Sequence, residues 1–376
     1  MEILGESLAD LRATRTSAKW RAYGPDVLPL WVAEMDARPC EPAVAAIRSA
    51  VERGDTGYAW PRDLAEAFAA FADRRWDWDV DPGTAFAVAD VMTGAEELIH
   101  TSPPGAAVVV SPPAYDAFYG FVESTRRRLV EAPLDAAHRL DPTALDRAFA
   151  EAGPGSTYLL CNPQNPTGTV HTAAELAELA RIADAHGVLV VSDEIHAPLV
   201  HPGATFTPYL AVPEAARGIA LVSAAKAWNL AGLKVALAIP GPGAADRLGE
   251  LHEVVSHGAS HLGVIAQVAA YTEGEPWLDQ LLDEVVARRT LATGLLHERL
   301  PQVEVAPSEA TYLAWLDCRG LGLADPCRTF FKQGKVALGR GEHYDRRHGR
   351  LWARLNLATS PEVLEEAVRR MAAAVG

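Results

Sequence analysis

Cysteine is rare in this 376-residue sequence: there are four, Cys40, Cys161, Cys318 and Cys327, with no C-x-x-C spacing. This argues against a disulfide framework or a cysteine metal site, and we expect a cytoplasmic protein. No stretch approaches the roughly 20 consecutive apolar residues of a membrane span, and residues 1–15 lack a signal-peptide pattern. Basic side chains number 34 against 49 acidic ones, for a formal charge of −15, which disfavours nucleic-acid and anionic-membrane partners.

Lysine is also scarce, yet two of the five lysines, Lys226 and Lys234, lie in the stretch VSAAKAWNLAGLK at 222–234. A lysine at the rim of a buried sheet loses hydration, so its amine is more often neutral and can form an imine with an aldehyde. A single lysine of this kind is more often a surface or ion-pairing group. The neighbouring motifs therefore have to decide its role.

Seven short apolar runs recur between about residues 85 and 240, and most do not alternate with polar residues. They are AFAVADV, AAVVVSP, RRLVEAP, STYLLCN, VLVVSDE, IALVSAA and KVALAIP. Helical patterns lie between several of them, notably one that begins at Thr172, with a glutamate three residues on, and ends near Gly187. This alternation predicts a three-layer α/β/α domain around a mostly parallel seven-stranded sheet.

A second, smaller α+β domain is predicted from the C-terminal quarter. Residues 275–300 have the pattern of a long amphipathic helix, and the alternating runs TYLAWLD and LWARLNLA follow it. The Pro-rich N-terminal segment fits neither pattern, and we expect it to cross the surface and join the C-terminal part. The predicted division is an N-terminal segment 1–45, a large domain 46–275 and a small domain 276–376.

Polar side chains stand at the carboxyl ends of three predicted strands, where α/β sheets bind ligands. Asp193 ends VLVVSD, Asn162 and Asn165 follow STYLLC, and Lys226 follows IALVSAA. Each has an ordinary alternative as a loop cap, a turn residue or a surface cation. Pyridoxal phosphate requires an imine-forming lysine, a carboxylate for its ring nitrogen, a donor for its phenolic oxygen and a phosphate cradle, and all four have candidates here.

The order of motifs resembles that of the fold-type I, aspartate-aminotransferase-like pyridoxal-phosphate enzymes over nearly the whole chain. Within them it is most similar to the cystathionine β-lyase-like carbon–sulfur lyase group, to which LPLWVAEMD and SDEIH point. The matching stretches are LPLWVAEMD (28–36), GYAWP (57–61), SPPAYDAF (111–118), NPQNPTG (162–168), SDEIH (192–196), SAAKAWNLAGLK (223–234), TYLAW (311–315) and ARLNLA (353–358).

The resemblance implies a role for each ring-binding residue. Lys226 would hold the cofactor as an imine and later move the Cα proton, and Asp193 would pair with the ring nitrogen. Asn165 would hydrogen-bond the phenolic oxygen, and Tyr115 would stack on the ring. His196 occupies a position where aminotransferases often have tyrosine.

The phosphate would bind backbone amides of Gly94 and Ala95, at the start of the predicted helix GAEELIHT, where the helix dipole favours an anion. Ser223 would add a hydroxyl. Lys234 stands where many relatives have a phosphate-binding arginine, so the charge is kept but the bidentate geometry is lost. Tyr58 would reach the phosphate and substrate of a neighbouring subunit.

Arg354 in ARLNLA would grip the substrate α-carboxylate through a two-bond contact. Trp31 is equally well explained as a substrate wall or as core packing. Three departures from the family pattern stand out: Ala225 replaces a common serine, Glu34 replaces an aspartate, and Asp345 replaces a glycine in a loop near the substrate.

Two rival sites find little support. In HEVVSH the histidines at 252 and 257 are five apart, about 140° around a helix, so they do not match the zinc motif HExxH. His257 and His261 share a face but have no third ligand, so we expect no metal site. PGPGAADRLG has Asp246 in place of the third glycine of a dinucleotide fingerprint and more simply opens a helix.

The resemblance implies a homodimer that acts on a small amino-acid substrate. The expected reaction is α,β-elimination on cystathionine or a similar thioether, giving a thiol, pyruvate and ammonia. An aminotransferase is the alternative, because both reactions use the same residues around the cofactor. A non-catalytic regulator on the same fold is a third possibility, although it would not need the lysine, aspartate and arginine set.

Overall fold

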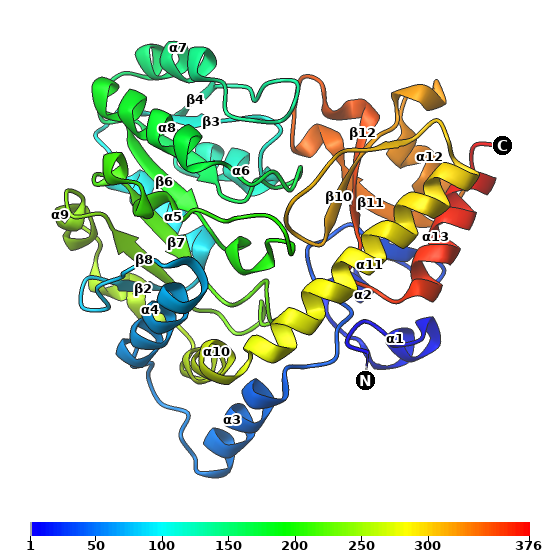
Figure 1. Ribbon diagram of the computed structural model, residues 1–376, viewed down its shortest axis with the longest axis horizontal. Helices are drawn as coiled ribbons and strands as arrows, with labels where there is room; N and C mark the ends of the chain where they lie inside the picture. Colours follow the sequence, from blue (N-terminus) through cyan, green and yellow to red (C-terminus); the bar gives the residue numbers. More distant parts are fainter. Residues whose placement is uncertain (1) are drawn as a thin grey trace.

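The larger of two sheets has seven strands in the order β2-β8-β7-β6-β5-β3-β4. The computed structural model describes residues 2–376, and Figure 1 shows their arrangement. The strands are β2 (Phe86–Val88), β3 (Ala107–Val110), β4 (Arg128–Glu131), β5 (Thr157–Cys161), β6 (Leu189–Asp193), β7 (Ile219–Val222) and β8 (Ala236–Pro240). Only β8 pairs antiparallel, with β7 on one side and β2 on the other. The predicted mostly parallel seven-stranded sheet is confirmed.

Helices cover both faces of this sheet, which explains why its strands are apolar throughout. In β3, Val108 and Val110 pack with α5 (Val91–His100) and α6 (Asp116–Ser124). Val109 points the other way, into a cluster with α7 (Pro142–Ala152) and α8 (Ala173–His186). The remaining helices of this region are α3 (Glu41–Glu52), α4 (Arg62–Trp76), α9 (Ala245–Gly249) and α10 (His261–Glu273).

Local side-chain chemistry sets the ends of α8 where the sequence predicted them. Thr172 and Glu175 form a reciprocal capping box at its start. Gly187 ends the helix in the left-handed conformation with φ 64°. Both predicted boundaries are confirmed. The chain then enters β6 within two residues, which leads directly to Asp193.

The smaller sheet joins the two ends of the chain in the order β1-β11-β12-β10-β9. Its strands are β1 (Leu28–Leu30), β9 (Glu304–Val305), β10 (Leu313–Asp317), β11 (Val336–Arg340) and β12 (Trp352–Asn356). β1 lies parallel to β11, so the N-terminal segment does join the C-terminal part. Helices α1 (Leu8–Thr14), α2 (Ala18–Arg21), α12 (Pro326–Lys332) and α13 (Pro361–Ala373) accompany it.

The long helix α11 (Glu275–Arg299) runs from the region of α10 towards the smaller sheet (Figure 1). The predicted long helix at 275–300 is thereby confirmed within one residue. Leu278 and Leu281 pack in the core that includes α4 and α10, whereas Ala292 and Leu296 pack with the smaller sheet. The helix therefore connects two apolar cores. None of the helices within residues 2–376 is long and apolar enough to cross a membrane.

Candidate active site

A cavity opens where β5, β6 and β7 end, at the edge of the sheet at which α/β folds bind ligands. It brings together eight side chains that bear polar groups, from segments between 90 and 234 of the sequence. The lining residues are Ala33, Asp90, Val91, Met92, Tyr115, Cys161, Asn165, Asp193, Ile195, His196, Ala225, Lys226, Ala231 and Lys234. Six of the predicted site residues are among them: Tyr115, Asn165, Asp193, His196, Lys226 and Lys234.

Lys226 lies in the turn that follows β7, and its side chain is partly buried. Its Nζ donates a hydrogen bond to the carbonyl oxygen of Ala33, at 2.9 Å. Burial and the nearby positive charge of Arg354 lower the pKa of this amine to about 8. A larger fraction of neutral, nucleophilic amine is therefore present near pH 8 than for an exposed lysine.

Asp193 is the last residue of β6, and its side chain is buried. Its Oδ1 accepts a hydrogen bond from the amide of Ile195 at 3.1 Å. Burial raises the pKa of this carboxyl group to about 6, against the opposing effects of that amide and of Lys226. A buried carboxylate of this kind is stabilised by a cationic ligand, such as a protonated ring nitrogen.

The helix on which the phosphate cradle was predicted begins three residues earlier than expected. Helix α5 begins at Val91 rather than at Gly94, because Asp90 is extended and its Oδ1 caps the amide of Thr93 at 2.7 Å. The amide of Gly94 is already bonded to the carbonyl of Asp90 at 2.9 Å, and that of Ala95 lies inside the helix. The amides of Val91 and Met92 precede any intrahelical acceptor, and both residues line the cavity.

Lys234 provides a cation at this helix start. Its Nζ lies 2.5 Å from Oδ2 of Asp90, a residue that the sequence reasoning did not select. Ser223, by contrast, donates its hydroxyl to the carbonyl of Val235 at 2.8 Å and contacts Gln267. The structure does not bring that hydroxyl to the lining of the cavity.

Arg354 projects from β12 of the smaller sheet, and its side chain is buried. Its Nη1 donates to Oδ1 of Asn165 and its Nη2 to the carbonyl of Trp31, both at 3.0 Å. Its Nε is buried without a partner among the described residues. A guanidinium that is bonded to Asn165 of the lining and keeps one unpartnered N–H can donate to the carboxylate of an amino acid.

His196 and Tyr115 complete the walls of the cavity. Burial, together with the charges of Lys226 and Arg354, lowers the pKa of His196 to about 3, so the imidazole is neutral. Its Nδ1 has no partner within residues 2–376. Tyr115 caps α6, and its hydroxyl lies 3.6 Å from Sδ of Met92. Both aromatic side chains can pack against a planar ring.

Arg354 is not itself among the residues that line the cavity, and three other residues singled out by sequence also lie outside the lining. Tyr58 is 94% exposed and shares a surface groove with Trp60 and His257. The indole of Trp31 packs edge-on against Tyr23, with ring centroids 5.9 Å apart, and only its carbonyl is bonded to Arg354. The carboxylate of Asp345 accepts from the amides at 347 and 348 of its own loop, at 2.9 and 2.8 Å.

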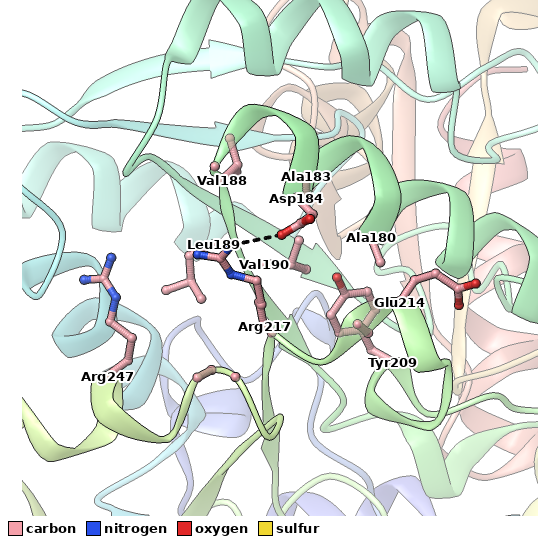
Figure 2. Close-up of a pocket in the computed structure, with 15 residues that line it drawn as sticks. Ala180, Ala183, Asp184, Val188, Leu189, Val190, Tyr209, Glu214, Arg217 and Arg247 are labelled. Carbon is pink, nitrogen blue, oxygen red and sulfur yellow. Dashed lines mark hydrogen bonds and ion pairs between the residues drawn. The ribbon is translucent and has the colours of Figure 1, made fainter.

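A second cavity lies at the opposite edge of the sheet, where β6 and β7 begin (Figure 2). Figure 2 shows the guanidinium of Arg217 directed at Asp184, whose Oδ1 is 3.1 Å away. Arg247 donates separately to the carbonyl of Thr101, at 2.9 Å. None of the residues predicted for catalysis lies at this edge.

The groups around the first cavity fit pyridoxal phosphate. Lys226 offers an amine of lowered pKa, Asp193 a buried carboxylate, Asn165 an amide, and Val91 and Met92 two helix-start amides. The fold and this set of residues define a fold-type I pyridoxal-phosphate enzyme.

Comparison with known proteins places the chain more closely. The family profile "Aminotransferase class I and II" matches residues 25–371. A Mycobacterium leprae protein, provisionally named cystathionine β-lyase, is 48% identical to this chain. The match covers 96% of this chain and 95% of the relative. Cystathionine β-lyase of Corynebacterium glutamicum is 38% identical, covering 97% and 98%. The chain therefore belongs to the class I and II aminotransferase family, in its cystathionine β-lyase-like group.

A solved structure agrees with this assignment. A provisionally named pyridoxal-phosphate-dependent β-cystathionase from Corynebacterium diphtheriae superposes with a TM-score of 0.92 at 36% identity, covering 99% of both chains. The fold and cofactor expected from the resemblance are thus confirmed.

Sequence reasoning did not select Asp90, Val91 and Met92, which stand at the start of α5 and line the cavity. The signal was available: Asp90 is an N-cap residue directly before an apolar periodic run. Ala33 and Ala231 could not be found from residue type. Ala33 contributes only its carbonyl oxygen, and Ala231 only lines the cavity.

Proposed function

We propose that this protein is a carbon–sulfur β-lyase, which eliminates the β-substituent of cystathionine or a related S-substituted cysteine to give a thiol, pyruvate and ammonia. The names of the 48% and 38% identical relatives support this choice over amino transfer. The observation that carries it is that Lys226 and Asp193 line one cavity, while Arg354, from the smaller sheet, is bonded to Asn165 in the lining of that cavity.

Each group has a defined task in this proposal. When bound, pyridoxal phosphate would withdraw electrons from the substrate Cα. Arg354 would hold the α-carboxylate and so orient the Cα–H bond. Lys226, with its pKa near 8, would accept the Cα proton and return a proton later. Asp193 would keep the ring nitrogen charged, which requires its carboxylate to be ionised at working pH.

The test is incubation of the holoenzyme with L-cystathionine in the absence of any keto acid. Release of pyruvate, measured by its coupled reduction to lactate, supports elimination. The Lys226→Ala variant is the control for background pyruvate. Strict dependence on an added keto acid would instead identify an aminotransferase. Purified protein that takes up no cofactor, seen as no visible absorption band, would favour a non-catalytic regulator.

The functional unit in this proposal is a homodimer, in which Tyr58 of one subunit reaches the phosphate site of the other. Support comes from the exposure of large apolar side chains next to each other: Tyr58 at 94% and Trp60 at 67%. Met92, beside the cradle, is also 40% exposed. Isolated exposed apolar residues are ordinary, but two exposed aromatic side chains in one groove favour a protein interface. We likewise retain the division at residues 45 and 275 as a proposal.

A further inference from the structure

Tyr344 lies against the guanidinium of Arg354, in the loop between β11 and β12. The Cζ of Arg354 is 4.7 Å from the centroid of the Tyr344 ring, and both side chains are buried, at 4% and 2% exposure. A guanidinium over an aromatic face is attracted by the ring quadrupole, most strongly where water is excluded. Such stacking covers the flat face of the guanidinium and leaves its edge N–H groups free.

Tyr344 is itself held from three sides. Its carbonyl accepts from the amide of Ala114 at 2.8 Å and from the hydroxyl of Tyr119 at 3.2 Å. Its ring meets that of Trp315 edge-on, with centroids 5.6 Å apart. Ala114 directly precedes Tyr115, a wall of the cofactor cavity. The backbone of Tyr344 is therefore anchored to α6 and the loop before it, and its ring packs against β10 of the smaller sheet.

Gly339 leaves the space that this arrangement needs. It pairs with Arg354 in the β11–β12 ladder. A Cβ at this position would lie 2.9 Å from the Tyr344 hydroxyl oxygen and 3.1 Å from Cβ of Arg354. Contacts this short force a neighbour to move, and the hydroxyl sits at the end of a packed ring. A side chain at 339 would therefore push the ring away from the guanidinium.

We propose that Tyr344 is a positioning residue for substrate binding: its ring fixes the plane of the Arg354 guanidinium so that the edge N–H groups meet the substrate α-carboxylate, and Gly339 makes room for that ring. This inference rests on the proposed function for the role of Arg354. The tyrosine hydroxyl is not required, because the ring face makes the contact.

The experiment is a titration of the holoenzyme with L-alanine, in which binding is measured by the change in cofactor absorption. L-alanine has a carboxylate but no β-leaving group. L-alaninamide, which lacks the carboxylate, is titrated in parallel. Tyr344→Leu should raise the dissociation constant for L-alanine about tenfold and leave that for the amide unchanged. Tyr344→Phe and Tyr158→Leu, which removes a buried ring from the α7–α8 face of the sheet, should stay within about twofold of wild type.

Gly339→Ala provides an independent arm if Tyr344→Leu does not fold. It should weaken L-alanine selectively, and the double variant Gly339→Ala, Tyr344→Phe should recover affinity because the closest clashing atom is gone. The proposal is overturned if Tyr344→Leu, or Gly339→Ala in its place, keeps wild-type affinity for L-alanine or weakens acid and amide alike. Failure to release pyruvate from cystathionine would refute the lyase function alone, since alanine binding requires no elimination.

Discussion

Replacing Asp193 by asparagine tests two effects of this buried carboxyl group separately: its cost to folding stability and its proposed pairing with the cofactor ring nitrogen. Burial raises the pKa of this group from 3.8 to about 6 in the folded chain. The native state then holds the proton more tightly than the unfolded state, so stability falls as pH rises from about 4 to 6 and stays reduced above that. The shift corresponds to about 3 kcal/mol of destabilisation at pH 8.

The cofactor-free Asp193→Asn variant should therefore be more stable than cofactor-free wild type at pH 8 by up to about 3 kcal/mol, with the two converging near pH 4. Asparagine retains an oxygen for the amide of Ile195. Urea unfolding of both proteins across this pH range measures the difference. In the holoenzyme the order should reverse, because the variant cannot pair with a charged ring nitrogen. Equal stability of the cofactor-free proteins at pH 8 would refute this reasoning.

Three further substitutions test the site. Lys226→Ala should prevent covalent attachment of the cofactor, so borohydride reduction and peptide mapping should label the 222–234 region in wild type only. Arg354→Lys should raise KM for L-cystathionine by about 30- to 150-fold with a smaller change in kcat, since a bidentate charged contact is worth about 2–3 kcal/mol; an unchanged KM would remove Arg354 from carboxylate binding. Mixing inactive Lys226→Ala with inactive Tyr58→Ala should restore activity, because a hybrid dimer has one site with both residues; no recovery on proven subunit exchange would place Tyr58 outside the neighbouring site.

Boundary errors show where sequence reasoning is weakest. The start of α5 was predicted at Gly94 because the family resemblance implied a phosphate site on the amides of Gly94 and Ala95, at the start of GAEELIHT. In the structure the Asp90 side chain caps the Thr93 amide and starts the helix three residues earlier. Local capping competes with motif similarity, and a sequence gives no relative energy for the two. The same carboxylate pairs with Lys234, 144 residues away, which no local pattern indicates.

The sequence alone determined the layers of the fold and the chemistry available at the sheet edge. Asp193, Asn165 and Lys226 follow short runs that are apolar throughout. Such runs predict strands of a parallel sheet covered on both faces, so these groups are predicted at the carboxyl ends of the strands.

Tertiary structure decided which groups meet. Arg354 bonds to Asn165 across 189 residues, and its stacking partner, Tyr344, has no signal in the sequence. Such contacts depend on how the two sheets pack, and on positions such as Gly339, where the lack of a side chain leaves room for a neighbouring ring. Those distances are set by the whole chain and not by any stretch of it.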